Sequence, residues 1–185
     1  RVLAVDCDFG FRNLDMLLGL QNETVYDLSD VLKGAPPEKC IIQRRGEGSL
    51  SFLASYSDLD FRPEPQAFQK LVTELQRRYD YVILDAGAGL GLSFSLCVAV
   101  CQTALLVTTP DRTALRDAEK VSYLISSVER ECGLIVNRVQ PAMIRKNCAP
   151  DIDSMIDYVG VRLMGLLPED RRLFAFQSAG LPRSE

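Results

Sequence analysis

The chain has 185 residues, of which 47% are hydrophobic and 25% charged, with a net charge of −4. These values are typical of one globular domain, which we expect to cover residues 1–185. The small negative charge argues against general attraction to nucleic acid, and six Cys with no Cys-x-x-Cys pair and no His argue against a zinc site.

Strand and helix patterns alternate along the chain. Apolar runs predict strands at residues 1–6, 50–54, 80–85, 103–108, 134–139 and 162–167. Helical spacing of apolar residues predicts helices at 14–18, 25–33, 63–79, 93–101, 113–130 and 152–159, with a last helical stretch after Pro168. A short element is expected from Pro36 to Ile42, and a turn over residues 44–49. This alternation predicts an α/β fold, with a mostly parallel sheet that carries helices on both faces.

The segment 81–91 (YVILDAGAGLG) is the most informative one. Its apolar run predicts a strand buried on both faces, and Asp85 then lies at the carboxyl end, where open α/β sheets bind ligands. Gly87, Gly89 and Gly91 allow a tight turn whose amides approach an anion closely. Such an Asp holds magnesium through water while the glycine amides meet a terminal phosphate. The alternative is an ordinary buried strand that ends in an Asp-Gly turn.

A second acidic segment follows the first predicted strand. Asp6 and Asp8 come directly after an apolar run, so they are expected to gather with Asp85 at one edge of the sheet. Carboxylates beside glycine-rich turns favour a magnesium-bound phosphate, with one group near the metal and another orienting a water. The alternative is that Asp6 and Asp8 cap the short helix after them.

Six ordered segments together resemble the MinD and ParA family of deviant Walker A P-loop ATPases. The segments are DCDFGFRNLD at 6–15, VYDLSDV at 25–31, DYVILDAGAG at 80–89, VTTP and ALRDA at 107–118, IVNR at 135–138 and GLLPED at 165–170. The resemblance covers essentially the whole chain.

The resemblance implies ATP and Mg²⁺ as cofactors and assigns roles to single residues. Asp85 would contact magnesium through water, Asp8 would position the attacking water, and Asp6 would support the metal shell. Gly89 would sense the γ-phosphate, with Gly10 also in the cofactor-binding set. The adenine would be surrounded by Asn137, Arg138, Pro168 and Asp170. From the residues alone, Asn137-Arg138 is more simply a strand end with an exposed Arg.

The chain departs from the family pattern in three respects. No Gly immediately precedes any Lys, so the Gly-x-x-x-x-Gly-Lys-[Ser/Thr] loop is missing. We therefore expect the first strand, the P-loop and the first helix of the family to be absent, and ATP binding to be weak or lost. The amphipathic C-terminal membrane helix is also missing. Gly87 stands where the family usually has Pro. The FlhG-like flagellar relatives also have Gly at this position.

The resemblance implies an ATPase that acts in placing the division septum and forms an ATP-dependent homodimer. MinC-like and MinE-like regulators, a bacterial cytoplasmic location, peripheral contact with the inner membrane in the full-length family and no nucleic-acid partner are expected with it. Two alternatives stay open: a non-catalytic partner-binding remnant of the fold, and an FlhG-like or ParA-like positioning ATPase.

Overall fold

The computed structural model describes residues 1–44, 50–146, 148–170 and 172. The chain divides into two compact units, of which the N-terminal unit covers Arg1–Val100 and the C-terminal unit begins at Cys101. A single domain over residues 1–185 stays a prediction.

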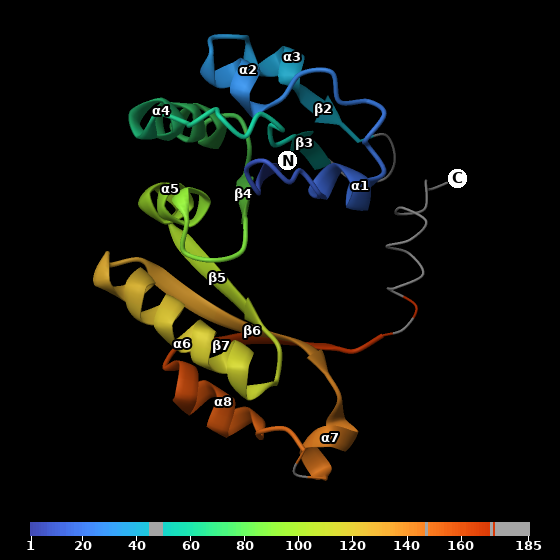
Figure 1. The fold of residues 1–185 in the computed structure, drawn as a ribbon, viewed down its shortest axis with the longest axis vertical. Coiled ribbons are helices and arrows are strands. Elements are labelled where there is room, and N and C mark those ends of the chain that lie inside the picture. The colour runs from blue at the N-terminus through green and yellow to red at the C-terminus, as the bar shows by residue number, and fades with distance from the viewer. Residues whose placement is uncertain (45–49, 147, 171, 173–185) are drawn as a thin grey trace. The chain divides into compact units, whose positions relative to one another are not determined.

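The N-terminal unit is built on a four-stranded sheet (Figure 1). Its strands are β1 (Val2–Cys7), β2 (Ile41–Gln43), β3 (Leu50–Leu53) and β4 (Tyr81–Ala86), in the order β2-β3-β1-β4. β1 runs parallel to both β3 and β4, whereas β2 pairs antiparallel with β3. The mostly parallel sheet is therefore confirmed.

Helices cover both faces of β1, because its apolar residues alternate in direction. The described residues of this unit form the helices α1 (Leu14–Leu18), α2 (Leu28–Leu32), α3 (Pro37–Cys40), α4 (Pro65–Gln76) and α5 (Leu92–Val100). On one face, Leu3 and Val5 form a buried cluster with residues of α2, α4 and α5. On the other face, Ala4 packs with Phe52, Leu20 and the α1 side chains.

The predicted burial of β4 on both faces is wrong. Tyr81 and Ile83 are 70% and 56% exposed. The reason is that β4 is the edge strand of its sheet among the described residues and pairs only with β1. An apolar run alone does not distinguish such a strand from a central one.

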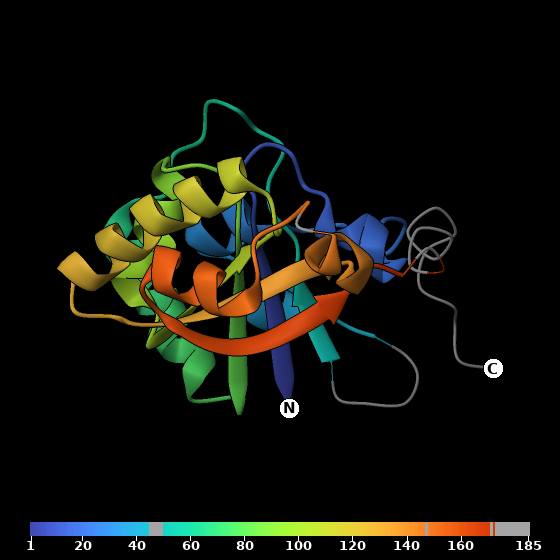
Figure 2. The same ribbon diagram turned by 90° about the horizontal axis from the view of Figure 1, so that it is seen from below.

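The C-terminal unit has a three-stranded parallel sheet. Its strands are β5 (Thr103–Thr108), β6 (Glu131–Val139) and β7 (Arg162–Pro168), in that order, and its helices are α6 (Arg112–Ser127), α7 (Pro141–Arg145) and α8 (Ile152–Val159). α6 and α8 lie side by side (Figure 2), and their side chains pack with Leu134, Val136 and Met155 in one buried cluster. One face of this sheet is thus covered by two helices.

The opposite face of this sheet exposes apolar side chains. Leu105, Val107 and Met164 are 57%, 57% and 55% exposed. A methyl group built on Gly133 would overlap Met164 and lie 3.6 Å from Leu105, so these two side chains meet over Gly133. Within the C-terminal unit, α6 and α8 form their buried cluster with the other face of the sheet.

The predicted elements agree with the structure except at a few boundaries. α7 was not predicted, and β6 begins at Glu131, three residues before the predicted start at Leu134. Helices α2, α4, α6 and α8 begin at an acidic residue whose side chain accepts a backbone hydrogen bond, as N-caps do. The turn predicted at 44–49 and the helical stretch after Pro168 fall almost entirely outside the described residues. No described helix is long and apolar enough to cross a membrane.

Candidate functional site

The predicted gathering of acidic residues at the end of β1 and β4 is present in the N-terminal unit. Asp6 and Asp85 are direct partners in the parallel register, and Asp8 follows one residue after β1 ends. Burial raises the pKa of Asp6, and the nearby charges of Asp85 and Asp8 add to the rise. The sheet edge therefore collects three carboxylates from two strands.

Asp6 organises the loop that leaves β1. Its side chain is fully buried, and its two oxygens accept hydrogen bonds from the backbone N–H of Asp8 (2.9 Å) and of Leu14 (3.1 Å). Leu14 is the first residue of α1, so the helix-capping role holds for Asp6. Burial raises the pKa of this carboxyl, and the two backbone hydrogen bonds oppose that rise. A supporting role in a metal shell stays a prediction.

Asp85 presents the more accessible carboxylate. It is exposed at the end of β4, and within the described residues its side chain accepts no hydrogen bond. Partial desolvation by the surrounding atoms raises its pKa, and the nearby charge of Asp8 adds to the rise. Both oxygens are therefore open to a cation, which would also relieve the repulsion from Asp8.

Asp8 is held by its backbone and by a side-chain contact. Its carbonyl accepts hydrogen bonds from the Ser55 hydroxyl (3.1 Å) and the N–H of Phe11 (3.1 Å), and its carboxylate lies 3.4 Å from the Asn13 side-chain amide. The carboxylate also rests against Gly87 of the loop after β4. The loop position of Asp8 is thus determined from several sides.

Two glycines of the predicted site have left-handed backbones, with φ of 90° at Gly10 and 87° at Gly89. The N–H of Gly10 donates to the carbonyl of Tyr56 (3.1 Å), so this amide is engaged within the protein. Next to it, Phe9 stacks on Tyr56 with ring centroids 5.1 Å apart. Gly89 has open space around it, as a loop that admits an anion requires.

The donor set fits magnesium rather than a metal enclosed by protein ligands. In the described ranges no three acidic, Cys or His side chains converge as a ready metal site. Magnesium commonly keeps several waters and takes only one or two carboxylates besides phosphate oxygens. Asp85, exposed and close to the charge of Asp8, meets that requirement.

The residues predicted around a base lie at the ends of β6 and β7 in the C-terminal unit. Val139 pairs in register with Pro168, and the N–H of Glu169 donates to the Val139 carbonyl (3.0 Å). Arg138, with φ of 58°, donates from Nε to Glu169 (2.9 Å) and from its backbone N–H to Asn137 Oδ1 (2.9 Å). The structure therefore brings the Asn137-Arg138 and Pro168-Glu169 segments together, while the Asp170 carboxylate pairs with Arg172 (2.7 Å).

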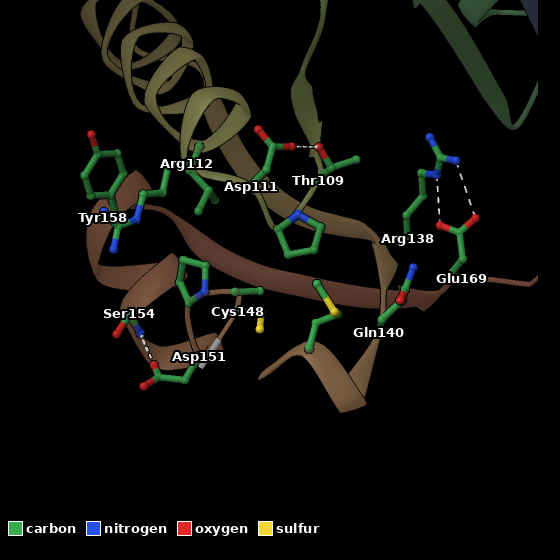
Figure 3. Close-up of a pocket in the computed structure, with 15 residues that line it drawn as sticks. Thr109, Asp111, Arg112, Arg138, Gln140, Cys148, Asp151, Ser154, Tyr158 and Glu169 are labelled. Carbon is green, nitrogen blue, oxygen red and sulfur yellow. Dashed lines mark hydrogen bonds and ion pairs between the residues drawn. The ribbon is translucent and has the colours of Figure 1, made fainter. Parts of the chain in front are cut away.

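An open cavity of about 1070 Å³ lies beside these segments (Figure 3). Arg138 and Glu169 form one wall, and Thr109, Arg112 and Tyr158 contribute others. Thr109 entered the sequence prediction only as part of the VTTP segment that resembles the family. The signal for a cavity was the polar Thr-Thr-Pro-Asp stretch directly after a strand, at the edge where such sheets bind ligands.

Parallel strands that end in acidic and glycine-rich turns define the class of α/β proteins that bind ligands at the carboxyl edge of the sheet. No family model matches the chain. It is 35% identical over 185 residues to the septum site-determining protein MinD of Synechocystis sp. PCC 6803, covering 98% of this chain and 70% of that protein. The chain belongs to the MinD family.

Two solved structures support the same assignment. The MinC:MinD cell division protein complex of Aquifex aeolicus matches with a TM-score of 0.89 at 33% identity, covering 98% of this chain and 74% of that chain. The septum site-determining protein MinD of Pyrococcus horikoshii OT3, complexed with Mg-ADP, matches with a TM-score of 0.85 at 28% identity, with the same coverage. The resemblance drawn from the sequence segments is confirmed, and so is the α/β fold of this ATPase class.

Proposed function

We propose that this protein acts as a MinD-like nucleotide hydrolase in division-site placement. The observation that carries the proposal is the edge of β1 and β4, where Asp6, Asp8 and Asp85 interact beside the open Gly89 turn. The names of the relatives support the cellular role.

Magnesium and a nucleotide are the proposed cofactors, and the Mg-ADP complex of the Pyrococcus relative supports them. Magnesium supplies charge neutralisation on the phosphate oxygens. Asp85 would hold the metal through water, because its carboxylate is the exposed one. Asp8 would orient an attacking water, and Asp6 would maintain the loop that places Asp8. The Gly89 amide would meet the terminal phosphate.

The residues proposed to contact the base lie in the C-terminal unit. Asn137 and Arg138 with Pro168 and Asp170 would surround the adenine, and the ion pair between Arg138 and Glu169 holds the two segments in place. ATP as the particular nucleotide belongs to this proposal.

The partners follow from the same family. A MinC-like regulator is proposed, since one of the similar solved structures is a MinC:MinD cell division protein complex. An ATP-dependent homodimer that cycles on hydrolysis, a MinE-like regulator, a bacterial cytoplasmic location and peripheral contact with the inner membrane complete the proposal. No nucleic-acid partner is proposed.

Calorimetry with Mg·ATP and Mg·ADP tests the proposal. It should be run on this chain and, if the reading frame continues upstream, on a protein extended by about 30 residues, one βα unit. Binding by either protein that is lost in Asp85→Ala and retained in Asp117→Ala, an exposed acidic control on α6, supports the proposal. Absence of binding in both proteins overturns it and favours a partner-binding remnant of the fold.

A further inference from the structure

Gly87, the first residue after β4, has no conformational reason to be glycine. Among the described residues, five glycines have a φ between 68° and 106°, which other residues rarely adopt, and Gly87 is not one of them. A φ outside that range is open to L-residues. What distinguishes Gly87 in this chain is therefore the space around it.

That space is occupied by Asp8. A Cβ built on Gly87 would overlap Asp8 Oδ1 and would lie 3.2 Å from Asp8 Cγ and 3.3 Å from Asp8 Cα. The contact follows from the register, because Asp6 pairs with Asp85 and Cys7 with Ala86, which leaves residues 8 and 87 side by side where the ladder ends. By contrast, a Cβ on Gly91 in the same loop would meet nothing within 4 Å.

Asp8 has little freedom to move away from a larger residue at position 87. Its N–H donates to Asp6 Oδ1 (2.9 Å), and its carbonyl accepts from Ser55 Oγ (3.1 Å). With the backbone held at both ends, the side chain would have to rotate. Gly87 is itself held, because its N–H donates to Ser93 Oγ (3.0 Å) on α5.

We infer that Gly87 is a positioning residue for Asp8. Because position 87 has no side chain, the loop after β4 packs closely against Asp8 in the loop after β1, and we call this contact the lock. The lock keeps the Asp8 carboxylate beside the strand end that carries Asp85. This inference rests on the proposed function for the meaning of that placement, but the contact itself is a property of the free chain.

A double-mutant cycle on the free chain tests the lock, with Gly87→Ala, Asp8→Ala and the double variant compared by urea unfolding. Gly87→Ala alone should lower the unfolding midpoint. In the Asp8→Ala background, where the overlapping carboxylate is gone, more than half of that loss should disappear. Gly91→Ala is the control in open space, and its effect on the midpoint should be smaller than that of Gly87→Ala and equal in both Asp8 backgrounds.

A spectroscopic measurement separates positioning from a general loss of stability. The NMR signal of the Asp8 carboxyl carbon should shift in Gly87→Ala and stay in place in Gly91→Ala. If Gly87→Ala alone does not fold, a folded double variant supports the lock and an unfolded double variant overturns it.

Equal costs of Gly87→Ala in both backgrounds, or an unmoved Asp8 signal, also overturn the inference. None of these measurements uses a nucleotide, so they remain decisive if Mg·ATP binding fails and the proposed function falls.

Discussion

The two units treat the faces of their sheets differently. In the N-terminal unit, β1 is buried from both sides, with Val5 in one cluster and Ala4 in another. In the C-terminal unit, Val136 is buried under α6 and α8, while Val107 and Met164 on the other face are more than half exposed. The apolar residues on both faces of β1 are therefore buried, whereas the C-terminal sheet buries those on one face and exposes those on the other.

The difference bears on where the chemistry lies. The strand covered on both faces carries Asp6, a fully buried carboxylate that needs hydrogen bonds from two backbone amides. The strand ends of the C-terminal unit carry exposed polar residues such as Arg138, which pairs with Glu169 in one wall of an open cavity. A buried carboxylate held by backbone hydrogen bonds, such as Asp6, suits the placement of a loop, whereas an open edge suits recognition of a larger ligand.

The largest expected effects come from core truncation in each unit. Phe68→Ala and Met155→Ala each remove a fully buried side chain and should cost roughly 3 kcal/mol of unfolding free energy. Hydrogen exchange should locate each loss, with β1 amides responding most to Phe68→Ala and β6 amides to Met155→Ala. Equal acceleration in both strands by either variant would show that the two units unfold as one.

A smaller effect separates a buried ion pair from an exposed one. Asp15 is 3% exposed and accepts from Arg12 Nε (2.7 Å), and Arg12 has φ of 47°, so Asp15→Ala leaves a charge unpaired on a strained residue. The loss should be about 2–3 kcal/mol. Its control is Asp117→Ala, which breaks the exposed i,i+3 pair with Lys120 in α6 and should cost less than about 0.5 kcal/mol.

Urea unfolding of the two variants measures this difference. Similar losses in Asp15→Ala and Asp117→Ala would mean that burial adds nothing to the Arg12–Asp15 pair.

The sequence predicted most elements, because their signals are local. The apolar runs of β1 and β5 and the acidic caps at Asp111 and Asp151 each lie within a few residues of the element they determine. The gathering of Asp6, Asp8 and Asp85 was also predictable, since parallel strands end at one edge.

Other features depend on contacts that no local pattern contains. The contact of Gly87 with Asp8 arises from the register of β1 against β4, and the exposure of Tyr81 and Ile83 arises from the order of strands. The antiparallel pairing of β2 is likewise a property of the sheet rather than of its three residues. The sequence therefore predicted the members of the site better than their contacts.

A third prediction tests whether the exposed face of the C-terminal sheet is exposed in solution. Val136→Thr places a hydroxyl in the core under α6 and α8 and should cost about 1–3 kcal/mol. Val107→Thr on the 57% exposed residue should change the unfolding free energy by less than about 0.5 kcal/mol. Urea unfolding of both variants decides the point. A comparable loss in Val107→Thr would indicate that this face is covered in solution.

The smallest expected effects concern the pH dependence of stability. Two carboxylates, Asp85 at the end of β4 and Asp111 at the start of α6, have pKa values shifted in opposite directions. Desolvation and the charge of Asp8 raise the pKa of Asp85 above 3.8, whereas hydrogen bonds from Thr109 and from the Ala114 N–H lower the pKa of Asp111. The Asp85 carboxyl favours the fold most below its ordinary pKa, and that contribution is lost as pH rises through the raised value. The Asp111 carboxylate favours the fold above its ordinary pKa, and that contribution is lost as pH falls through the lowered value.

Substitution by Asn should therefore act in opposite directions at pH 7. Asp85→Asn should raise the unfolding free energy slightly, by less than about 1 kcal/mol because water screens the group, with the gain fading as pH falls toward 4. Asp111→Asn retains an N-cap side chain and should lower the midpoint at pH 7, and this loss should vanish in acid. Urea unfolding between pH 3 and pH 7 measures both slopes. Slopes of the same sign would mean that the pKa values of Asp85 and Asp111 do not shift in opposite directions. The contrast between these two carboxylates, one in each unit, would then fail.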